Sequence, residues 1–146
     1  MIRYEGLFFE TAATSLIHLL EENPLPIKAA QILHCTFKYH PNEKEIFNDI
    51  VGKEFEIELI DYACNGENSD FEIVLPKQLE NYYINYDPST NSLIAPHITV
   101  FLPFNAISVN TTNLEFQSLS KPVKVIGNFG YCIEENNREI ISFLPL

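Results

Sequence analysis

Two short segments of this chain carry the same polar pair, a histidine followed two residues later by a threonine. His34-Cys35-Thr36-Phe37 and His97-Ile98-Thr99-Val100 both stand in stretches rich in β-branched and aromatic residues, which favour β-strands. Alternate residues of a strand point to the same face, so each histidine shares a face with its threonine. The intervening Cys35 and Ile98 point to the other face, where we expect the core.

Two imidazoles beside two hydroxyls suit the cleavage of a phosphodiester. Histidine titrates near neutral pH, so one ring can accept a proton from the attacking hydroxyl or water while the other donates a proton to the leaving oxygen. A threonine hydroxyl can donate a hydrogen bond to a non-bridging phosphate oxygen and so stabilise the charge that shifts in the transition state. This scheme requires no metal and no cofactor. The sequence does not say which histidine is the acid and which is the base.

The surroundings of the two motifs also repeat. Each motif is followed by further strand candidates that end in a hydrophobic run and a proline, at 71–76 in the first half and at 140–145 in the second. The matching order predicts a duplicated unit with pseudo-repeat halves at about 1–76 and 77–146. Neither half is large enough to bury a good core alone, so we predict a single domain over residues 1–146 in which the halves pack as two lobes.

The pattern of apolar residues predicts an α+β fold with antiparallel sheet in two pseudo-symmetric lobes and helices on the outside. Helical spacing over residues 12–20 predicts a first helix, ended by Asn23-Pro24. Asn42, with Glu45 three residues later, predicts a second, capped helix that ends at Gly52. Residues 105–113 are predicted to be a loop. Strands are predicted at 6–9, 31–40, 55–59, 71–75, 96–102, 121–131 and 139–144.

Composition and charge restrict the partners of the chain. Its 146 residues include 9 Lys and Arg against 20 Asp and Glu, a formal charge of −11, which argues against a long duplex nucleic acid or an anionic membrane surface. A hydrophobic content of 46% excludes a disordered chain, and no apolar run approaches the ~20 residues of a membrane span. The three cysteines have no short spacing and the first residues lack a secretory pattern, so we predict a cytoplasmic protein. The sequence predicts no particular oligomeric state.

The two motifs resemble the hallmark of the 2H phosphoesterases, also called LigT-like proteins, which is one His-x-[Ser/Thr]-hydrophobic motif in each lobe of a pseudo-symmetric α+β fold. Gly6–Phe9 and the predicted helix at 12–20 look like the opening strand and helix of that family, so the resemblance covers nearly the whole chain. It implies metal-independent cleavage of 2′,3′-cyclic phosphates, 2′–5′ linkages, RNA ends or cyclic nucleotides, including the cyclic oligonucleotide messengers that compact phage members degrade. It also implies that His34 and His97 form the acid/base pair and that the two threonines position the phosphate.

The small size and the negative charge favour a small nucleotide or a short RNA end as the substrate. Strand alternation places Lys38 on the face of His34 and Thr36, where its ammonium could bind the substrate; it could equally be a solvated lysine at a strand end. Phe101 follows Thr99 and could stack on a base, or equally cover an edge of the core.

Three other hypotheses compete with the phosphodiesterase. A zinc site lacks the usual paired-ligand spacing, and Cys35 points away from His34 on a strand. A cysteine nucleophile is disfavoured because all three cysteines stand in apolar strand contexts, which raise the thiol pKa. A non-catalytic module that sequesters a nucleotide or binds a protein on the same fold stays open, and turnover would separate it from an enzyme.

Overall fold

The computed structural model describes residues 1–10, 33–64, 69–101 and 116–146. In these residues the chain forms one seven-stranded antiparallel sheet in which β2-β1-β6-β3-β4-β5 are neighbours in that order. The remaining strand, β7, pairs with the C-terminal end of β6. The strands are β1 (Ile2–Phe9), β2 (His34–Tyr39), β3 (Glu54–Cys64), β4 (Ser69–Val74), β5 (His97–Phe101), β6 (Gln117–Glu135) and β7 (Arg138–Ser142).

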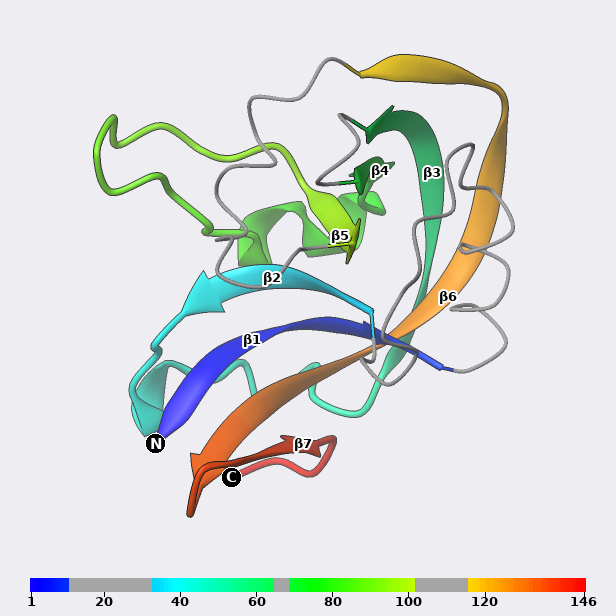
Figure 1. Ribbon diagram of the computed structural model, residues 1–146. Coiled ribbons are helices and arrows are strands. Elements are labelled where there is room, and N and C mark those ends of the chain that lie inside the picture. The colour runs from blue at the N-terminus through cyan, green and yellow to red at the C-terminus, as the bar shows by residue number, and fades with distance from the viewer. Residues whose placement is uncertain (11–32, 65–68, 102–115) are drawn as a thin grey trace.

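The sheet curls until its two end strands meet. Figure 1 shows β2 and β5, which are the first and last strands of the path, lying close to one another, and the two strands are in contact. The result is a nearly closed, barrel-like sheet. β6 comes from the second half of the sequence, yet it pairs with β1 on one side and β3 on the other. The described strands therefore make one continuous sheet, in which a strand of the second predicted half stands between two strands of the first.

The predicted strands are all present, but the predicted α+β class is not confirmed. The helices of the described residues are two short 3-10 helices, η1 (Glu43–Glu45) and η2 (Lys77–Tyr82). The predicted helix at 12–20 and the predicted loop at 105–113 lie outside the described residues. The antiparallel sheet is thus the part of the predicted architecture that the structure bears out.

The helix predicted to start at Asn42 is wrong, and local hydrogen bonds explain why. The Asn42 side chain donates to the Glu45 carboxylate at 2.9 Å and caps no backbone N–H. The backbone N–H of Phe47 donates to the Glu5 carboxylate at 3.3 Å, so it is not available to a helical carbonyl. The chain is extended at Ile46, with φ −64° and ψ 131°, and η1 ends there. The apolar residues of this segment still reach the core.

The core fills the inside of the curled sheet with large apolar side chains. Phe37 packs edge-on against Phe129 and against Tyr83, with ring centroids 5.2 Å apart in both pairs. Fully burying a side chain of this size contributes roughly 1.5–3 kcal/mol. The least exposed of these side chains come from six strands and η2: Leu7, Phe9, Cys35, Phe37, Ile57, Leu59, Phe71, Leu79, Ile98 and Phe129.

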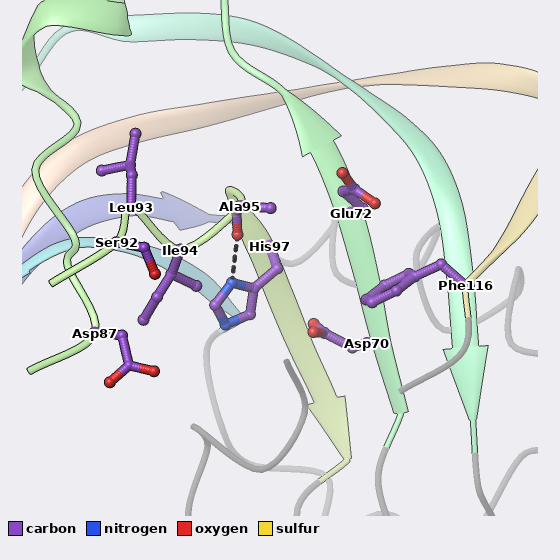
Figure 2. Close-up of a pocket in the computed structure, with 9 residues that line it drawn as sticks. All are labelled: Asp70, Glu72, Asp87, Ser92, Leu93, Ile94, Ala95, His97 and Phe116. Carbon is purple, nitrogen blue, oxygen red and sulfur yellow. Dashed lines mark hydrogen bonds between the residues drawn. The ribbon is translucent and has the colours of Figure 1, made fainter. Parts of the chain in front are cut away.

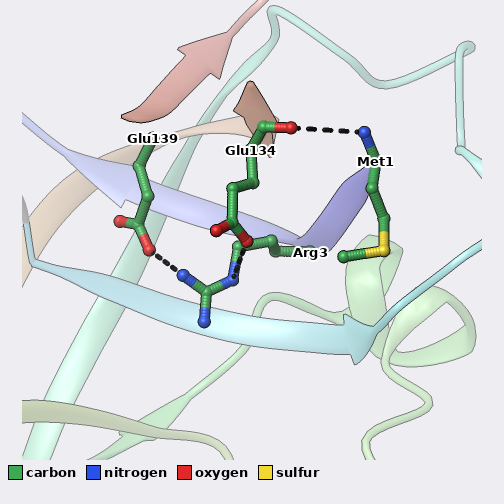
Figure 3. A network of polar contacts seen from close by, with 4 residues as sticks. All are labelled: Met1, Arg3, Glu134 and Glu139. Atoms are coloured by element: carbon green, nitrogen blue, oxygen red, sulfur yellow. Dashed lines mark hydrogen bonds and ion pairs between the residues drawn. The ribbon is translucent and has the colours of Figure 1, made fainter. Parts of the chain in front are cut away.

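A polar cluster ties the start of β1 to β6 and β7 on the outside of the sheet (Figure 3). The Met1 amine donates to the Glu134 carbonyl at 3.3 Å, and Arg3 forms ion pairs with Glu134 and Glu139. The side chains of Arg3, Glu134 and Glu139 are all more than one third exposed, so solvent screens these pairs and they add little stability.

Glu5 is a carboxylic acid in the interior of the sheet. Its side chain is fully buried, and its Oε1 has no hydrogen-bond partner among the described residues. Burial raises the pKa of Glu5 to about 7, and the Phe47 N–H and the Lys38 ammonium offset only part of that effect. Ionisation of Glu5 therefore destabilises the folded state.

We expect Glu5→Gln to change how stability depends on pH. A carboxyl whose pKa rises from 4.5 to about 7 on folding leaves stability intact below pH 4.5 and lowers it as the pH rises through 7. Between pH 4.5 and 7 the free energy of unfolding of the wild-type protein should fall by up to about 3 kcal/mol, at 1.36 kcal/mol for each pKa unit. That of the variant should not fall for this reason. Urea unfolding at pH 4 to 8 measures the difference. Parallel stability curves would show that Glu5 stays ionised without cost.

Candidate active site

The first motif lies on β2, with its histidine and threonine on the side of the sheet away from the core. Cys35 is buried inside, while the His34 ring stacks on Tyr4 of β1 with centroids 4.6 Å apart and 20° between the planes. Phe8 lies 5.8 Å from the same ring. Thr36 is 7% exposed, so its surroundings are more enclosed than those of His34. The predicted shared face of His34 and Thr36 agrees with these positions.

Phe37 is an extra residue in β2, and it reverses the alternation of side chains between the two faces of the sheet for the residues that follow it. The register pairs Thr36 with Gly6 and Lys38 with Glu5, which leaves the residue between Thr36 and Lys38 without a partner. Lys38 therefore lies on the face opposite to the motif, where its ammonium pairs with Glu45 and lowers the pKa of that carboxyl. The predicted placement of Lys38 beside the motif histidine is wrong.

The second motif lies on β5 and has the same form. Ile98 is fully buried, whereas His97 and Thr99 pair across β4 with Glu72 and Asp70 and lie on the face away from the core. A register irregularity follows this motif too, between the pairs at Thr99 and Phe101. The backbone of Phe101 pairs with β4, while its side chain, a predicted base-stacking group, lies outside what the structure describes.

The two motifs meet where the ends of the sheet come together. The backbone N–H of His97 hydrogen-bonds the thiol of Cys35, the central residue of the first motif. Burial raises the pKa of this thiol to about 12, so Cys35 stays protonated and packs as an apolar residue, as predicted. The contact brings the start of the second motif directly against the first.

The His97 ring is held in a defined protonation state. Its Nδ1 lies 2.9 Å from the carbonyl oxygen of Ala95, and because a carbonyl can only accept, Nδ1 carries the proton. Nε2 then keeps its lone pair. Burial lowers the pKa of His97 against a smaller opposing effect of the Ala95 hydrogen bond, so the ring is neutral near pH 7. A neutral imidazole of fixed tautomer is suited to act as a base.

A cavity of about 230 Å³ opens beside His97 (Figure 2). Its described lining combines apolar walls with acidic groups and does not include His34 or either motif threonine. The Asp70 carboxylate points toward the His97 ring in Figure 2, and Asp70 is 1% exposed. The lining residues are Asp70, Glu72, Asp87, Ser92, Leu93, Ile94, Ala95, His97 and Phe116.

The pKa values of two acids in the cavity, Asp87 and Glu72, are shifted in opposite directions. Asp87 accepts hydrogen bonds from the backbone N–H and the hydroxyl of Ser89, at 2.8 and 2.7 Å, and these bonds lower its pKa. Burial and a hydrogen bond with Asp61 on the neighbouring strand raise the pKa of Glu72. Asp87 is therefore a fixed carboxylate at neutral pH, whereas Glu72 holds its proton more tightly than an ordinary glutamate.

The acidic residues around His97 were not among the site residues that the sequence predicted. Asp70 and Glu72 reach the site only because β4 pairs with β5 in one register, and Asp87 arrives from a separate turn. Their i, i+2 spacing on a strand was the one available signal for Asp70 and Glu72. The same spacing occurs on any half-exposed strand, so it could not single out a site.

No family model and no curated protein matches this sequence. Within the described ranges, no three His, Cys, Asp or Glu side chains are grouped so that they could hold a metal ion. Neither η1 nor η2, the helices of the described residues, is long or apolar enough to span a lipid bilayer.

Proposed function

We propose that this protein is a metal-independent phosphodiesterase of the 2H type that acts on a small nucleotide or a short RNA end. The observation that supports it most is the contact between β2 and β5, the strands that carry the two His-x-Thr motifs, with the backbone of His97 beside the Cys35 thiol. Both motifs turn their polar pairs away from the core and both are followed by a register irregularity. This likeness supports a duplicated catalytic unit more than two unrelated strand histidines.

In the proposed reaction His97 is the base and His34 is the acid. Nε2 of His97 takes the proton of the attacking hydroxyl or water, whose oxygen forms a bond to phosphorus. The bond from phosphorus to the leaving oxygen breaks, and His34 gives its proton to that oxygen. The hydroxyls of Thr36 and Thr99 donate hydrogen bonds to the non-bridging oxygens, which carry the charge of the transition state. His97 is assigned as the base because its Nε2 keeps a lone pair that can accept a proton.

The pH profile of kcat/KM is expected to be bell-shaped. Its acid limb reports the loss of the base, and because burial lowers the pKa of His97, this limb should have its midpoint below 6.5, the ordinary value for histidine. Its alkaline limb reports the loss of the proton on the acid. Initial rates from pH 4.5 to 9 would measure both limbs. A rate that rises steadily with pH and requires added divalent metal would contradict the two-imidazole scheme.

The test of the function is turnover in EDTA with identification of the product. The substrates are 2′,3′-cyclic nucleotides, linear 2′–5′ and 3′–5′ oligonucleotides, and cyclic di- and trinucleotides. A released nucleotide with a new phosphomonoester or cyclic phosphate end supports the proposal. Tight binding with no product favours the alternative, a module that sequesters a nucleotide.

The cysteines bear on the proposed location. Cys35 and Cys132 form no disulfide, which fits the proposed cytoplasmic location.

A further inference from the structure

We infer that Tyr4 is a positioning residue for the proposed acid: its ring holds the His34 imidazole in place and stabilises the protonated form of that imidazole. This inference rests on the proposed function, in which His34 gives a proton to the leaving oxygen. It goes further because Tyr4 lies outside both motifs and acts through His34 rather than on the substrate.

The rings of Tyr4 and His34 form a close stack. Their centroids are 4.6 Å apart and their planes differ by 20°, so the imidazole lies over the face of the phenol ring. The ring of Phe8 lies 5.8 Å from His34 and 5.9 Å from Tyr4. Two aromatic rings of β1 therefore restrict the orientation of the imidazole, and that of Tyr4 is the nearer and the more nearly parallel of the two.

The pairing of β1 with β2 explains how Tyr4 reaches this position. Tyr4 pairs with Tyr39, whereas His34 lies at the other end of β2. The intervening pair on the same face of the sheet is Gly6 with Thr36. Because Gly6 carries no side chain, nothing on β1 separates the ring of Tyr4 from that of His34, and the two rings meet above this pair.

The phenol of Tyr4 is held neutral, so Tyr4 acts through its ring and not through a charge. Burial, the Cys132 thiol beside it and the carboxylate of Glu139 raise the pKa of Tyr4, against a smaller opposing effect of Arg3. The two charged groups near Tyr4, on Arg3 and Glu139, form an ion pair with one another. Their effects on the stack therefore largely cancel.

Other ionisable groups near His34 belong to the end of β1 and to β5. The Asn128 side chain donates to the Glu10 carboxylate at 3.3 Å, so this exposed carboxylate is directed toward β6 and away from β2. On β5, the ring of His97 is neutral near pH 7 because burial lowers its pKa. Neither group favours a cation at His34 as directly as the Tyr4 ring in contact with it.

The stack gives the two motif histidines opposite tendencies. The face of an aromatic ring is electron-rich and attracts a cation, so the Tyr4 ring favours the imidazolium form of His34 over the neutral form. The surroundings of His97 favour the neutral ring. An acid and a base that work together at neutral pH need environments that differ in this way.

The experiment is an NMR titration of the histidine rings in the full chain from pH 5 to 9. The signal that is lost in His34→Ala identifies His34. Tyr4→Leu removes the aromatic ring and should lower the pKa of His34 by about half a unit. Tyr4→Phe keeps the ring and should change that pKa by less than about 0.2 unit. Tyr86→Leu, the same substitution at an exposed tyrosine outside the seven strands, should leave it unchanged.

A second variant replaces Tyr4 by pentafluorophenylalanine. Its ring keeps the shape of the stack but reverses the charge distribution, so its face repels a cation. The pKa of His34 should fall at least as far as in Tyr4→Leu. This variant decides the matter if Tyr4→Leu does not fold.

The outcomes separate this inference from the proposed function. A pKa of His34 that is unchanged when the ring is removed or fluorinated would overturn the inference. With a substrate that is turned over, the alkaline limb of kcat/KM should move to lower pH by the same amount as the pKa of His34. A limb that stays in place while this pKa falls would also overturn it, because His34 would not be the acid. A lowered pKa of His34 without turnover of any phosphodiester would leave the effect of Tyr4 on His34 standing and refute the enzyme.

Discussion

Replacing either His34 or His97 by alanine is expected to lower kcat by about 10²–10⁴-fold, the usual contribution of one acid or base group. Each substitution removes one of the two proton transfers and leaves the substrate-binding surface largely in place. KM should therefore change much less than kcat. Steady-state kinetics in EDTA, on whichever substrate the turnover screen identifies, gives both constants.

His40→Asn is the matched control for the two active-site variants. His40 is exposed and has a φ of 49°, a left-handed conformation that asparagine tolerates well. Its substitution removes an imidazole six residues from His34 without loss of an acid or base, so kcat should stay within about twofold of wild type.

The double variant of His34 and His97 should have a kcat little lower than that of either single variant, because the two groups act as a unit. A single variant that keeps more than about a tenth of the wild-type kcat would remove that histidine from the mechanism.

Gly6→Ala is expected to destabilise the fold by at least about 3 kcal/mol. A Cβ at this position would lie 2.0 Å from the carbonyl oxygen of Cys35, which is a backbone atom and cannot rotate away. Gly6 pairs with Thr36 next to the register irregularity of β2, so the strand that carries the first motif would have to move. We therefore expect loss of activity together with loss of stability. Chemical denaturation followed by circular dichroism measures the change.

Gly127→Ala is the comparison for that substitution. A Cβ there would lie 3.0 Å from the ring edge of Phe9 and 3.3 Å from the Cβ of Leu7, and a shift of a few tenths of an ångström relieves both contacts. Its stability should stay within about 1 kcal/mol of wild type. If Gly6→Ala were as stable as Gly127→Ala, the close approach of β1 to β2 described for the first motif would be wrong.

The strands could be predicted from the sequence because hydrophobic alternation reports directly on a half-buried sheet. The same signal placed His34 with Thr36 and His97 with Thr99, since it needs only the order of residues within one strand. Lys38 was misplaced because an extra residue in a strand leaves no trace in the alternation, and it reverses the face of everything after it.

Long-range pairing accounts for what the sequence could not predict. The insertion of β6 between β1 and β3 depends on which strands meet, and the acids around His97 depend on the register of β4 against β5. The helix expected after Asn42 failed for a similar reason, because a carboxylate from a distant strand, Glu5, takes the N–H of Phe47. In each case the deciding contact joins residues far apart along the chain.

If His34 and His97 act on one phosphorus atom, both rings must respond to a ligand that mimics that atom, and ¹⁵N NMR of the histidine rings detects this response. The ligand is a uridine–vanadate complex, which mimics a five-coordinate phosphorus, titrated into protein with labelled histidines. We expect the ring nitrogens of His34 and His97 to shift together with a single dissociation constant, while those of His40 do not shift. A shift of only one of the two rings, or two different constants, would contradict it.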